Sequence, residues 1–327
     1  MTKRGATPDG VRAAANRVAK WVTRTPILPF RIGPDRLWAK AECLQQGGAF
    51  KLRGATNRLL QLDPEQRARG VVAFSSGNHA LGIAIAARRL GMAATIVMPT
   101  DAPAVKRDAV LAEGARIVGY DRATEDRAAI GAALAAESGA TLVPSFDDVD
   151  VIEGQGSAGV ELAGQMRDVA GGDPAKVIVP CGGGGLAAGI ALAIPEAEIL
   201  IVEPEGWDDM GRSLEAGRPV PVAADAPRTL CDALMTPLVS PLTLDVLTAR
   251  EARAVAVSDA EIRQAMIFAA RALRLVVEPG GAAALAAVLA GKAGALPERT
   301  AVVISGGNVD LPAYAGIVGD QASEVSR

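Results

Sequence analysis

The sequence predicts an α/β protein built from two open, mostly parallel αβα domains. Short runs rich in β-branched residues alternate along the chain with alanine-rich stretches of helical length. These short runs are apolar, which is typical of parallel strands covered by helices on both faces. The chain has 327 residues, of which 50% are hydrophobic, and this is enough for two modest hydrophobic cores.

The elements are expected in the following order. Thr7, Pro8 and Asp9 form an N-cap region, so a first helix is expected over about 8–22. A second helix is expected from Lys51, in the stretch "KLRGATNRLLQL". Strands are predicted at 71–74, 94–99, 115–120, 141–144, 176–180, 198–203 and 300–305. Helices are predicted between them, at 103–113, 123–138, 157–169, 186–193, 259–274 and 281–291.

The elements divide into two groups. Strand–helix units between about 70 and 147 are expected to form a small sheet of their own, and a second group begins near 176. We therefore expect a small domain over 68–147 and a large domain formed by 1–67 together with 148–327. Ligands of open α/β sheets bind at the carboxyl ends of the strands, so a cleft between the domains is the expected binding site.

The composition excludes several classes of function. A formal net charge of −3 and an aromatic content of 3% give neither the basic nor the stacking surface of a nucleic-acid-binding protein. The apolar runs are too short for a membrane span, and the first ten residues lack the apolar core of a signal peptide. Cys43, Cys181 and Cys231 are far apart, which fits a reduced cytoplasm and gives no zinc site.

Lys51 is an unusual residue to begin a helix. It follows two glycines, an alanine and a phenylalanine. A cation is poorly placed at a helix N-terminus, because the macrodipole is positive there. Taken alone, Lys51 would be interpreted as a surface lysine. The alternative is a functional amine that must lose its proton, which both burial and the helix dipole would favour.

A glycine-rich segment, "CGGGGLAAG", follows the strand predicted at 176–180 and leads into a helix. Glycines let the backbone approach a ligand, and the free N–H groups of the helix favour a phosphate, whereas a simple tight turn needs only one or two glycines. Gly182, Gly184 and Ala187 also fit the dinucleotide fingerprint, with Glu203 about 20 residues further on. An NAD(P)-dependent oxidoreductase is therefore an alternative.

Two further segments follow predicted strands. "SSGNHA", residues 75–80, places hydroxyls, an amide and the chain's single histidine at a helix start, a combination that suits a carboxylate. We interpret His79 as a hydrogen-bonded structural residue rather than a general base, and nothing else supports a catalytic triad. "SGGN", residues 305–308, is either a turn or a contact for a flat heterocycle.

In this order and spacing, "GAFKLRGA", "SSGNHA", "GGGGLAAG" and "SGGN" resemble the motifs of the fold type II pyridoxal-phosphate (PLP) enzymes, whose fold is tryptophan-synthase-β-like. That group contains threonine and serine dehydratases, serine racemases and 3-hydroxyaspartate dehydratases. The resemblance covers 25–311, and Ala49 stands where the family usually has serine. It implies two domains with PLP in the cleft between them.

The resemblance implies a role for each motif. Lys51 would form a Schiff base with the PLP aldehyde, Phe50 would pack on the pyridine ring and Asn78 would hydrogen-bond the 3-hydroxyl. Ser305 would face the ring nitrogen, where a neutral hydroxyl gives a weaker electron sink than an aspartate and favours β-elimination over transamination. The phosphate would be held by Gly182, Gly183, Gly184, Gly185 and Leu186.

The same resemblance implies a reaction. Lys51 would abstract the α-proton, and Ser76 matches the serine on the opposite face in racemases of the group. The implied enzyme is a dehydratase (ammonia-lyase) that eliminates water from threonine or serine and gives a 2-oxo acid and ammonia. A 3-hydroxyaspartate dehydratase and a serine racemase are alternatives on the same scaffold. The residues implied around the substrate carboxylate are Ser75, Ser76, Asn78 and His79.

"VEPEGWDDM", residues 202–210, resembles the family's divalent-metal segment. Glu203 and Asp209 would supply carboxylate oxygens and Trp207 a backbone carbonyl, a set that suits magnesium, calcium or manganese. An acidic loop at a helix start is the simpler interpretation, because Asp209 suits the helix dipole in any case.

Two residues bear on the choice of substrate. Arg127 aligns with an arginine near the substrate pocket of racemase-like members, where its guanidinium would hold a second carboxylate, as in 3-hydroxyaspartate. It is equally interpretable as a solvated helix arginine. Thr236 stands where the family has a hydroxyl near the substrate. Members of this family are usually homodimers, which is the expected state, and the expected partner is a small amino-acid substrate.

Overall fold

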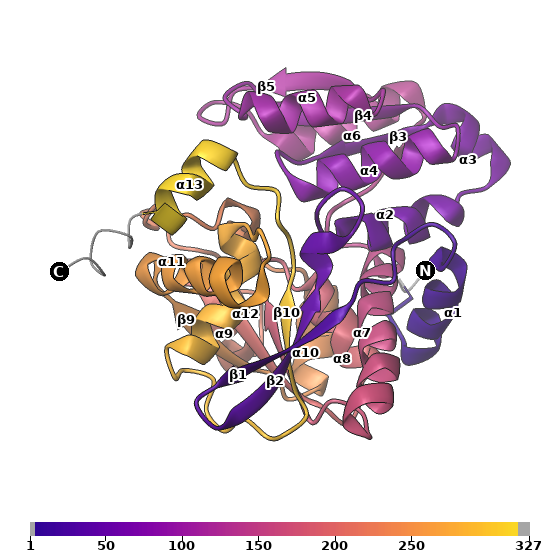
Figure 1. Cartoon of the computed structure of the whole chain (residues 1–327). Coiled ribbons are helices and arrows are strands. Elements are labelled where there is room, and N and C mark those ends of the chain that lie inside the picture. The colour runs from indigo at the N-terminus through magenta and orange to yellow at the C-terminus, as the bar shows by residue number, and fades with distance from the viewer. Residues whose placement is uncertain (1–3, 320–327) are drawn as a thin grey trace.

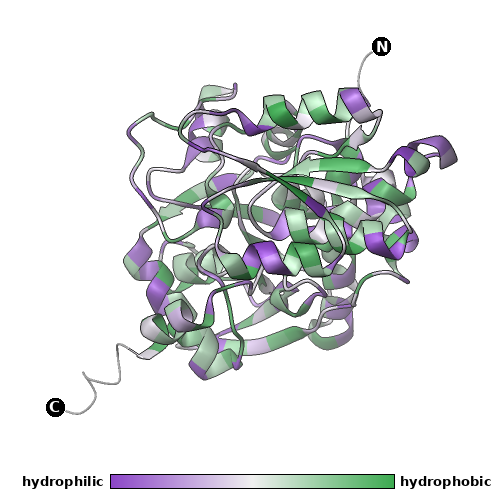
Figure 2. Ribbon diagram, turned by 90° about the horizontal axis from the view of Figure 1, so that it is seen from above, coloured by the Kyte–Doolittle hydropathy of each residue, from purple (hydrophilic) through white to green (hydrophobic). Residues whose placement is uncertain are grey.

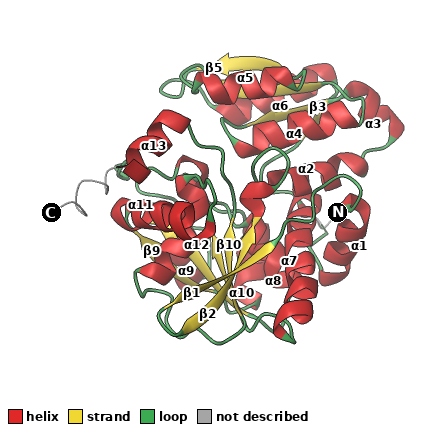
Figure 3. Ribbon diagram, in the orientation of Figure 1, coloured by secondary structure: helices red, strands yellow, loops and turns green. Residues whose placement is uncertain are grey.

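The structure is a computed structural model that describes residues 4–319. Two mostly parallel β-sheets, each with helices on both faces, form two domains, and the smaller one lies at the top of the view in Figure 1. The same layering is visible by element type in Figure 3. The predicted fold class is confirmed.

The sheet of the large domain has six strands in the order β1-β2-β10-β7-β8-β9. The first two form an antiparallel hairpin at one edge, and every other pairing is parallel. The strand bounds are β1 Ile27–Ile32, β2 Asp35–Ala41, β7 Lys176–Pro180, β8 Glu198–Pro204, β9 Arg253–Val257 and β10 Thr300–Ile304.

The sheet of the small domain has four parallel strands in the order β5-β4-β3-β6. All four lie within 71–142, and the domain boundaries at 68 and 147 remain a prediction. The bounds are β3 Val71–Phe74, β4 Ala94–Pro99, β5 Arg116–Tyr120 and β6 Thr141–Leu142.

Thirteen α-helices cover these sheets in the part of the chain that the structure describes. Their bounds are α1 Pro8–Val18, α2 Lys51–Leu60, α3 Pro64–Arg69, α4 Asn78–Arg89, α5 Ala104–Ala112, α6 Arg127–Ser138, α7 Val149–Ala170, α8 Gly185–Ala193, α9 Asp209–Ala216, α10 Pro241–Ala249, α11 Asp259–Phe268, α12 Pro279–Leu289 and α13 Leu311–Gly319. Short helical turns lie at Glu42–Leu44 (η1), Asp232–Leu234 (η2) and Ala269–Leu273 (η3).

The central strands are buried on both faces, which explains their continuous apolar sequence. Ile178 and Val302 pack with α12 in one core cluster, while Val177 and Ala301 pack with α8 in another. Successive side chains of a strand point to opposite faces, so each strand serves both clusters. In Figure 2 the strands, and much of the ribbon of the helices beside them, have the colours of hydrophobic residues.

Some elements differ from the predictions. The hairpin β1–β2 and the strand β9 were not predicted. Both β1 and β9 are edge strands, and all three strands mix charged residues with apolar ones. The helix predicted at 157–169 begins earlier, at Val149, since the Asp148 carboxylate accepts a hydrogen bond from the Val151 N–H and caps it. The strand predicted at 141–144 contains only two residues.

The two sheets turn the carboxyl ends of their strands toward a common cavity. Its wall includes residues directly after β3, β7 and β10, namely Ser75, Gly182 and Ser305. This is the position expected for a ligand in open α/β sheets. Among residues 4–319, no helix combines the length and apolar character needed to span a bilayer.

Candidate active site

The cavity between the domains has a volume of about 350 Å³. Both domains line it. The cofactor and substrate residues predicted from the sequence all lie on its wall: Phe50, Lys51, Ser75, Ser76, Asn78, His79, Arg127, Gly182, Gly183, Gly184, Gly185, Leu186, Thr236 and Ser305. The three predicted metal ligands, Glu203, Trp207 and Asp209, do not line it.

Lys51 opens α2 at the floor of this cavity. The two glycines before the helix, Gly47 and Gly48, have φ of 76° and 72°, which lets the chain turn sharply into it. The Lys51 ammonium donates a hydrogen bond to the Ser145 carbonyl at 3.0 Å and lies 5.2 Å from the centroid of the Phe50 ring. Burial lowers the pKa of Lys51 to about 8, so a neutral amine is accessible near neutral pH.

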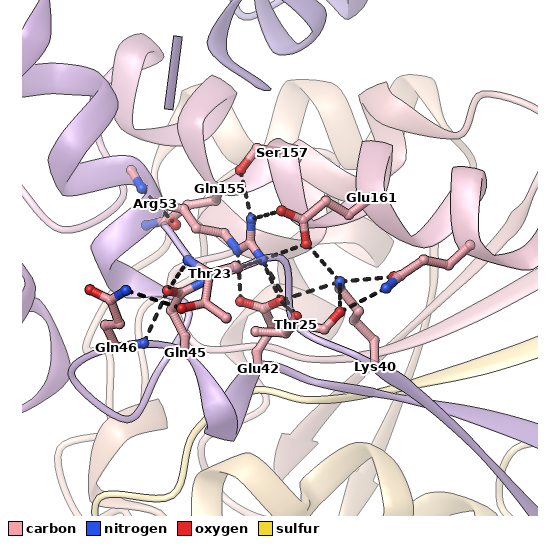
Figure 4. A network of polar contacts seen from close by, with 12 residues as sticks. Thr23, Thr25, Lys40, Glu42, Gln45, Gln46, Arg53, Gln155, Ser157 and Glu161 are labelled. Atoms are coloured by element: carbon pink, nitrogen blue, oxygen red, sulfur yellow. Dashed lines mark hydrogen bonds and ion pairs between the residues drawn. The ribbon is translucent and has the colours of Figure 1, made fainter. Parts of the chain in front are cut away.

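A buried ionic network holds the helix that carries Lys51 (Figure 4). Arg53, two residues further along α2, is fully buried and donates to both carboxylate oxygens of Glu42, at 2.7 and 2.8 Å. It also donates to Glu161 of α7 at 2.8 Å, and Lys40 of β2 donates to the same carboxylate at 2.8 Å. The network therefore joins α2 to the hairpin and to α7, and it fixes the position of the start of α2, where Lys51 lies.

The tetraglycine segment forms a cradle that side chains would fill. Gly184 has a φ of 82°, and a Cβ built on it would lie 2.6 Å from the Met210 side chain. A Cβ on Gly183 would overlap the Phe146 ring. The segment ends at the N-terminus of α8, whose N-cap Gly184 offers no side-chain capping bond, so the first N–H groups stay available for an anion.

The "SSGNHA" segment forms a second helix N-terminus on the cavity wall. The helix α4 starts at Asn78, and its N-cap Gly77 makes no side-chain capping bond. His79 is buried, and its Nε2 lies 2.9 Å from the Val143 carbonyl. Burial lowers the pKa of His79 to about 3, so the ring is neutral and acts there as a hydrogen-bond donor.

Arg127 begins α6 and reaches the cavity over the Phe74 ring, 5.9 Å from its centroid. Its neighbour Asp126 is occupied elsewhere, because that carboxylate caps α6 by accepting from the Ala128 and Ala129 N–H groups. Within residues 4–319, no carboxylate forms an ion pair with Arg127. The guanidinium is thus available to an anionic ligand.

Lys106, Asp232 and Glu278 are charged wall residues that were not predicted from the sequence. Lys106 of α5 and Asp232 of η2 form an ion pair across the cavity mouth, joining the small domain to the large one. Glu278, directly before α12, contributes a buried carboxyl to the wall and accepts a hydrogen bond from Asn78 at 2.6 Å. A glutamate within the apolar run "RLVVEPGGAAALAA" was the signal that could have identified it.

The acidic loop after β8 contains buried oxygens without partners. Glu203 is fully buried and accepts hydrogen bonds from the Met210 and Gly211 N–H groups at 2.9 and 2.8 Å. Both carboxylate oxygens of Asp209 are buried and have no hydrogen-bond partner in the described chain. Burial raises the pKa of Glu203 to about 8 and that of Asp209 to about 7. Two carboxylates in this state fit a bound cation.

Comparisons with known proteins agree with this geometry. Residues 18–307 match the family model described as pyridoxal-phosphate dependent enzyme. An L-threo-3-hydroxyaspartate ammonia-lyase of Saccharomyces cerevisiae is 41% identical over 313 residues, covering 93% of this chain and 94% of the yeast protein. The crystal structure of a threonine deaminase from T.th. matches with a TM-score of 0.86 and 41% identity, covering 93% and 99% of the two chains.

Maize serine racemase matches over 99% of this chain and 100% of its own, with a TM-score of 0.88 and 34% identity. The family model and these relatives each cover most of the chain, and they include the segments that line the cavity. The chain belongs to the family of pyridoxal-phosphate dependent enzymes of fold type II.

Proposed function

We propose that the protein is a PLP-dependent ammonia-lyase that dehydrates β-hydroxy amino acids, with Lys51 as the residue that carries the cofactor. The observation that carries this proposal is the enclosed Lys51 amine, with a pKa lowered to about 8, in the same cavity as the glycine cradle. Bound PLP would supply the electron sink that stabilises charge at the substrate Cα during β-elimination.

The residues that would hold the cofactor fit it in chemistry and in space. The N–H groups of Gly183, Gly184 and Gly185 at the start of α8 would bind the phosphate, since a helix N-terminus attracts anions. Phe50 would pack on the ring, and the Ser305 hydroxyl would face the ring nitrogen as a neutral partner. Such a partner leaves the ring less electron-withdrawing than a carboxylate partner would, which favours elimination.

The residues that would act on the substrate lie on two elements. Ser75, Ser76 and the backbone N–H of Asn78 at the start of α4 would bind its carboxylate. The neutral Lys51 amine would take the α-proton, and Ser76 would exchange a proton on the opposite face, which allows some racemisation. His79 would have a structural role in the cavity wall, because its Nε2 is hydrogen-bonded to the Val143 carbonyl.

A dinucleotide is the weaker interpretation of the same glycine segment. Its ribose would need Glu203, but that carboxylate lies away from the cavity wall and is bonded to the Met210 and Gly211 N–H groups. An oxidoreductase would also leave Lys51 without a role.

Arg127 favours 3-hydroxyaspartate as the substrate over threonine or serine. A guanidinium that lacks a carboxylate partner and lines the cavity would bind the second carboxylate of that substrate. The yeast relative named above is an ammonia-lyase of L-threo-3-hydroxyaspartate. Thr236, which is buried on the same wall, would contact the substrate through its hydroxyl.

A divalent cation, magnesium, calcium or manganese, would occupy the acidic loop. The unpartnered Asp209 oxygens support it, with Glu203 and the Trp207 carbonyl completing an oxygen shell together with water. Unchanged activity and unchanged melting temperature after chelation would contradict it.

The protein would act as a homodimer in the cytoplasm. Its three cysteines are free and buried, which fits a reducing compartment. Leu44, Val276 and Leu311 are exposed, and the segments that carry them are neighbours in space. Gly307, shortly before Leu311, lies against both the Val276 carbonyl and Cys43, the residue before Leu44. These side chains would lie under a second copy, and sedimentation analysis would test this.

A substrate panel tests the proposed function. Purified protein with PLP should show an absorption band at about 410–420 nm that borohydride bleaches. It should then release 2-oxo acid from 3-hydroxyaspartate, threonine or serine. Absence of the band would contradict the PLP role of Lys51, and a band without 2-oxo acid from any of these substrates would contradict the dehydratase.

A further inference from the structure

Glu278 is a buried carboxyl on the cavity wall that the proposed reaction does not use. It is 3% exposed, which is unusual for a glutamate unless it is paired. It occupies the N-cap position of α12 without capping the helix, and no cation of the described chain lies within ion-pair distance of it. Its partner is instead the Asn78 amide, whose Nδ2 donates to Glu278 Oε1 at 2.6 Å.

The neighbouring hydrogen bonds fix the orientation of Asn78. The Nδ2 of Asn308 donates to the Gly47 carbonyl at 2.7 Å and to Asn78 Oδ1 at 2.8 Å, which uses both of its hydrogens. Asn78 must therefore direct its oxygen toward Asn308 and its NH₂ group toward Glu278. Glu278 accepts a hydrogen bond from one N–H of the Asn78 amide. The second N–H of Asn78, which lines the cavity, remains available to a ligand there.

The backbone holds Glu278 against the strand-end turn. The Glu278 N–H donates to the Gly306 carbonyl at 3.1 Å, and a Cβ on Gly306 would overlap Glu278 Oε1. The carboxyl is thus held beside Asn78, a residue of the proposed cofactor site, and against Gly306, which directly follows Ser305. Only a glycine at position 306 leaves room for it.

The charged and titratable groups around Glu278 come from three segments, η1, α5 and the start of η2. Asp232 of η2 raises its pKa and Lys106 of α5 lowers it, but these two are paired with each other. The thiols of Cys43 and Cys231 also face it, and burial raises the pKa of each to about 12, so both are neutral. Burial dominates, and it raises the pKa of Glu278 to about 7.

We propose that Glu278 is a positioning residue that aims an Asn78 N–H at the ring oxygen of PLP and takes up a proton when the cofactor binds. The inference rests on the proposed function. The 3-oxygen of PLP carries negative charge when its proton is lost, and a second negative charge close to it is unfavourable. The proton comes from solvent and forms a neutral carboxylic acid, and no other bond changes at Glu278.

Isothermal titration of the apoprotein with PLP, in buffers of different ionisation enthalpy, measures this proton uptake directly. At pH 7 the wild type should bind as much as about half a proton more than Glu278→Gln, because the free carboxyl is then about half ionised. At pH 5 the difference should fall close to zero, since Glu278 is already protonated. Glu65→Gln, an exposed glutamate of α3, is the matched control and should behave as wild type.

Two further variants separate positioning from proton uptake. Asn308→Ala frees the Asn78 amide to turn, so PLP affinity should fall about tenfold while proton uptake is retained. Glu278→Gln keeps the shape of the side chain and still accepts the Asn78 N–H, so its melting temperature should stay close to wild type.

The outcomes distinguish this inference from the proposed function. PLP that binds wild type and Glu278→Gln with equal proton uptake at pH 7 would overturn the role of Glu278 and leave the ammonia-lyase intact. PLP that fails to form an imine band with wild type would overturn the proposed function itself. Unchanged PLP affinity in Asn308→Ala would overturn the positioning of Asn78.

Discussion

Arg127 is held near the cavity by stacking on Phe74 and by the start of α6, and no carboxylate of the described chain neutralises it. A substrate with a second carboxylate would gain a bidentate, charge-assisted contact there. Threonine and serine lack that group, so the arginine can only discriminate in favour of a dicarboxylate.

Replacing Arg127 by alanine should therefore lower kcat/KM for 3-hydroxyaspartate by about 10- to 100-fold, the loss expected for a charged hydrogen bond. The value for serine should change little. Steady-state kinetics with both substrates gives the comparison, and Arg122→Ala, an exposed arginine of the same segment, serves as control. An intact value for hydroxyaspartate would remove Arg127 from substrate recognition.

The charge state of Lys51 should control how fast the apoprotein acquires PLP. Condensation with an aldehyde needs the neutral amine, and burial lowers the pKa of Lys51 to about 8. The rate of imine formation should thus rise about tenfold per pH unit below 8 and level off above it. Stopped-flow absorbance between pH 6 and 10 follows this, and a midpoint near the ordinary lysine value would contradict the burial of the amine.

At the residue scale, the sequence was most informative where chemistry needs special residue types. Lys51 and the glycines at 182–185 could be found because a lysine at a helix start and four consecutive glycines are locally unfavourable. Glu278 and Lys106 could not be found in this way. Their neighbours in space, Asn78 and Asp232, are distant in sequence, so only the folded chain brings them together.

At the element scale, periodicity predicted the buried strands and the longer helices but failed at the edges. The strand β9 has the sequence "RAVAV" and lies at an edge of the sheet, where most of its side chains are partly exposed. It therefore has no continuous apolar run that would identify it as a buried strand. The stretch predicted as one helix over 259–274 is an α-helix that ends in a π-helical turn at Ala269–Leu273, after which Arg274 has a φ of 59°. Composition does not distinguish that turn from an α-helix.

The element that matters most for the site is α2, and its buried ion pairs should dominate its stability. Arg53→Ala would leave Glu42 and Glu161 with one partner fewer in a dry interior, so the free energy of unfolding should fall by about 3–5 kcal/mol. Arg12→Ala, which breaks an exposed pair with Asp9, should cost under about 1 kcal/mol. Urea unfolding followed by circular dichroism measures both, and equal losses would show that the Arg53 network does not hold α2.

At the scale of the whole molecule, the cavity is built from both domains, so a cofactor bound there couples their unfolding. The small domain supplies Ser76 and Asn78, and the large one supplies Lys51 and the glycine cradle, with the pair Lys106–Asp232 across the mouth. A ligand that binds only the folded arrangement stabilises it by mass action.

Saturating PLP, at a free concentration of about 100 times Kd, should stabilise the native protein by about 2.7 kcal/mol and raise the melting temperature in a single transition. Lys51→Ala keeps the glycine cradle but loses the covalent attachment, so at the same PLP concentration its shift should be smaller. Scanning calorimetry of both proteins with and without PLP makes the comparison. Two separate transitions, of which PLP moves only one, would show that the cofactor contacts a single domain and that the cavity between them is not its site.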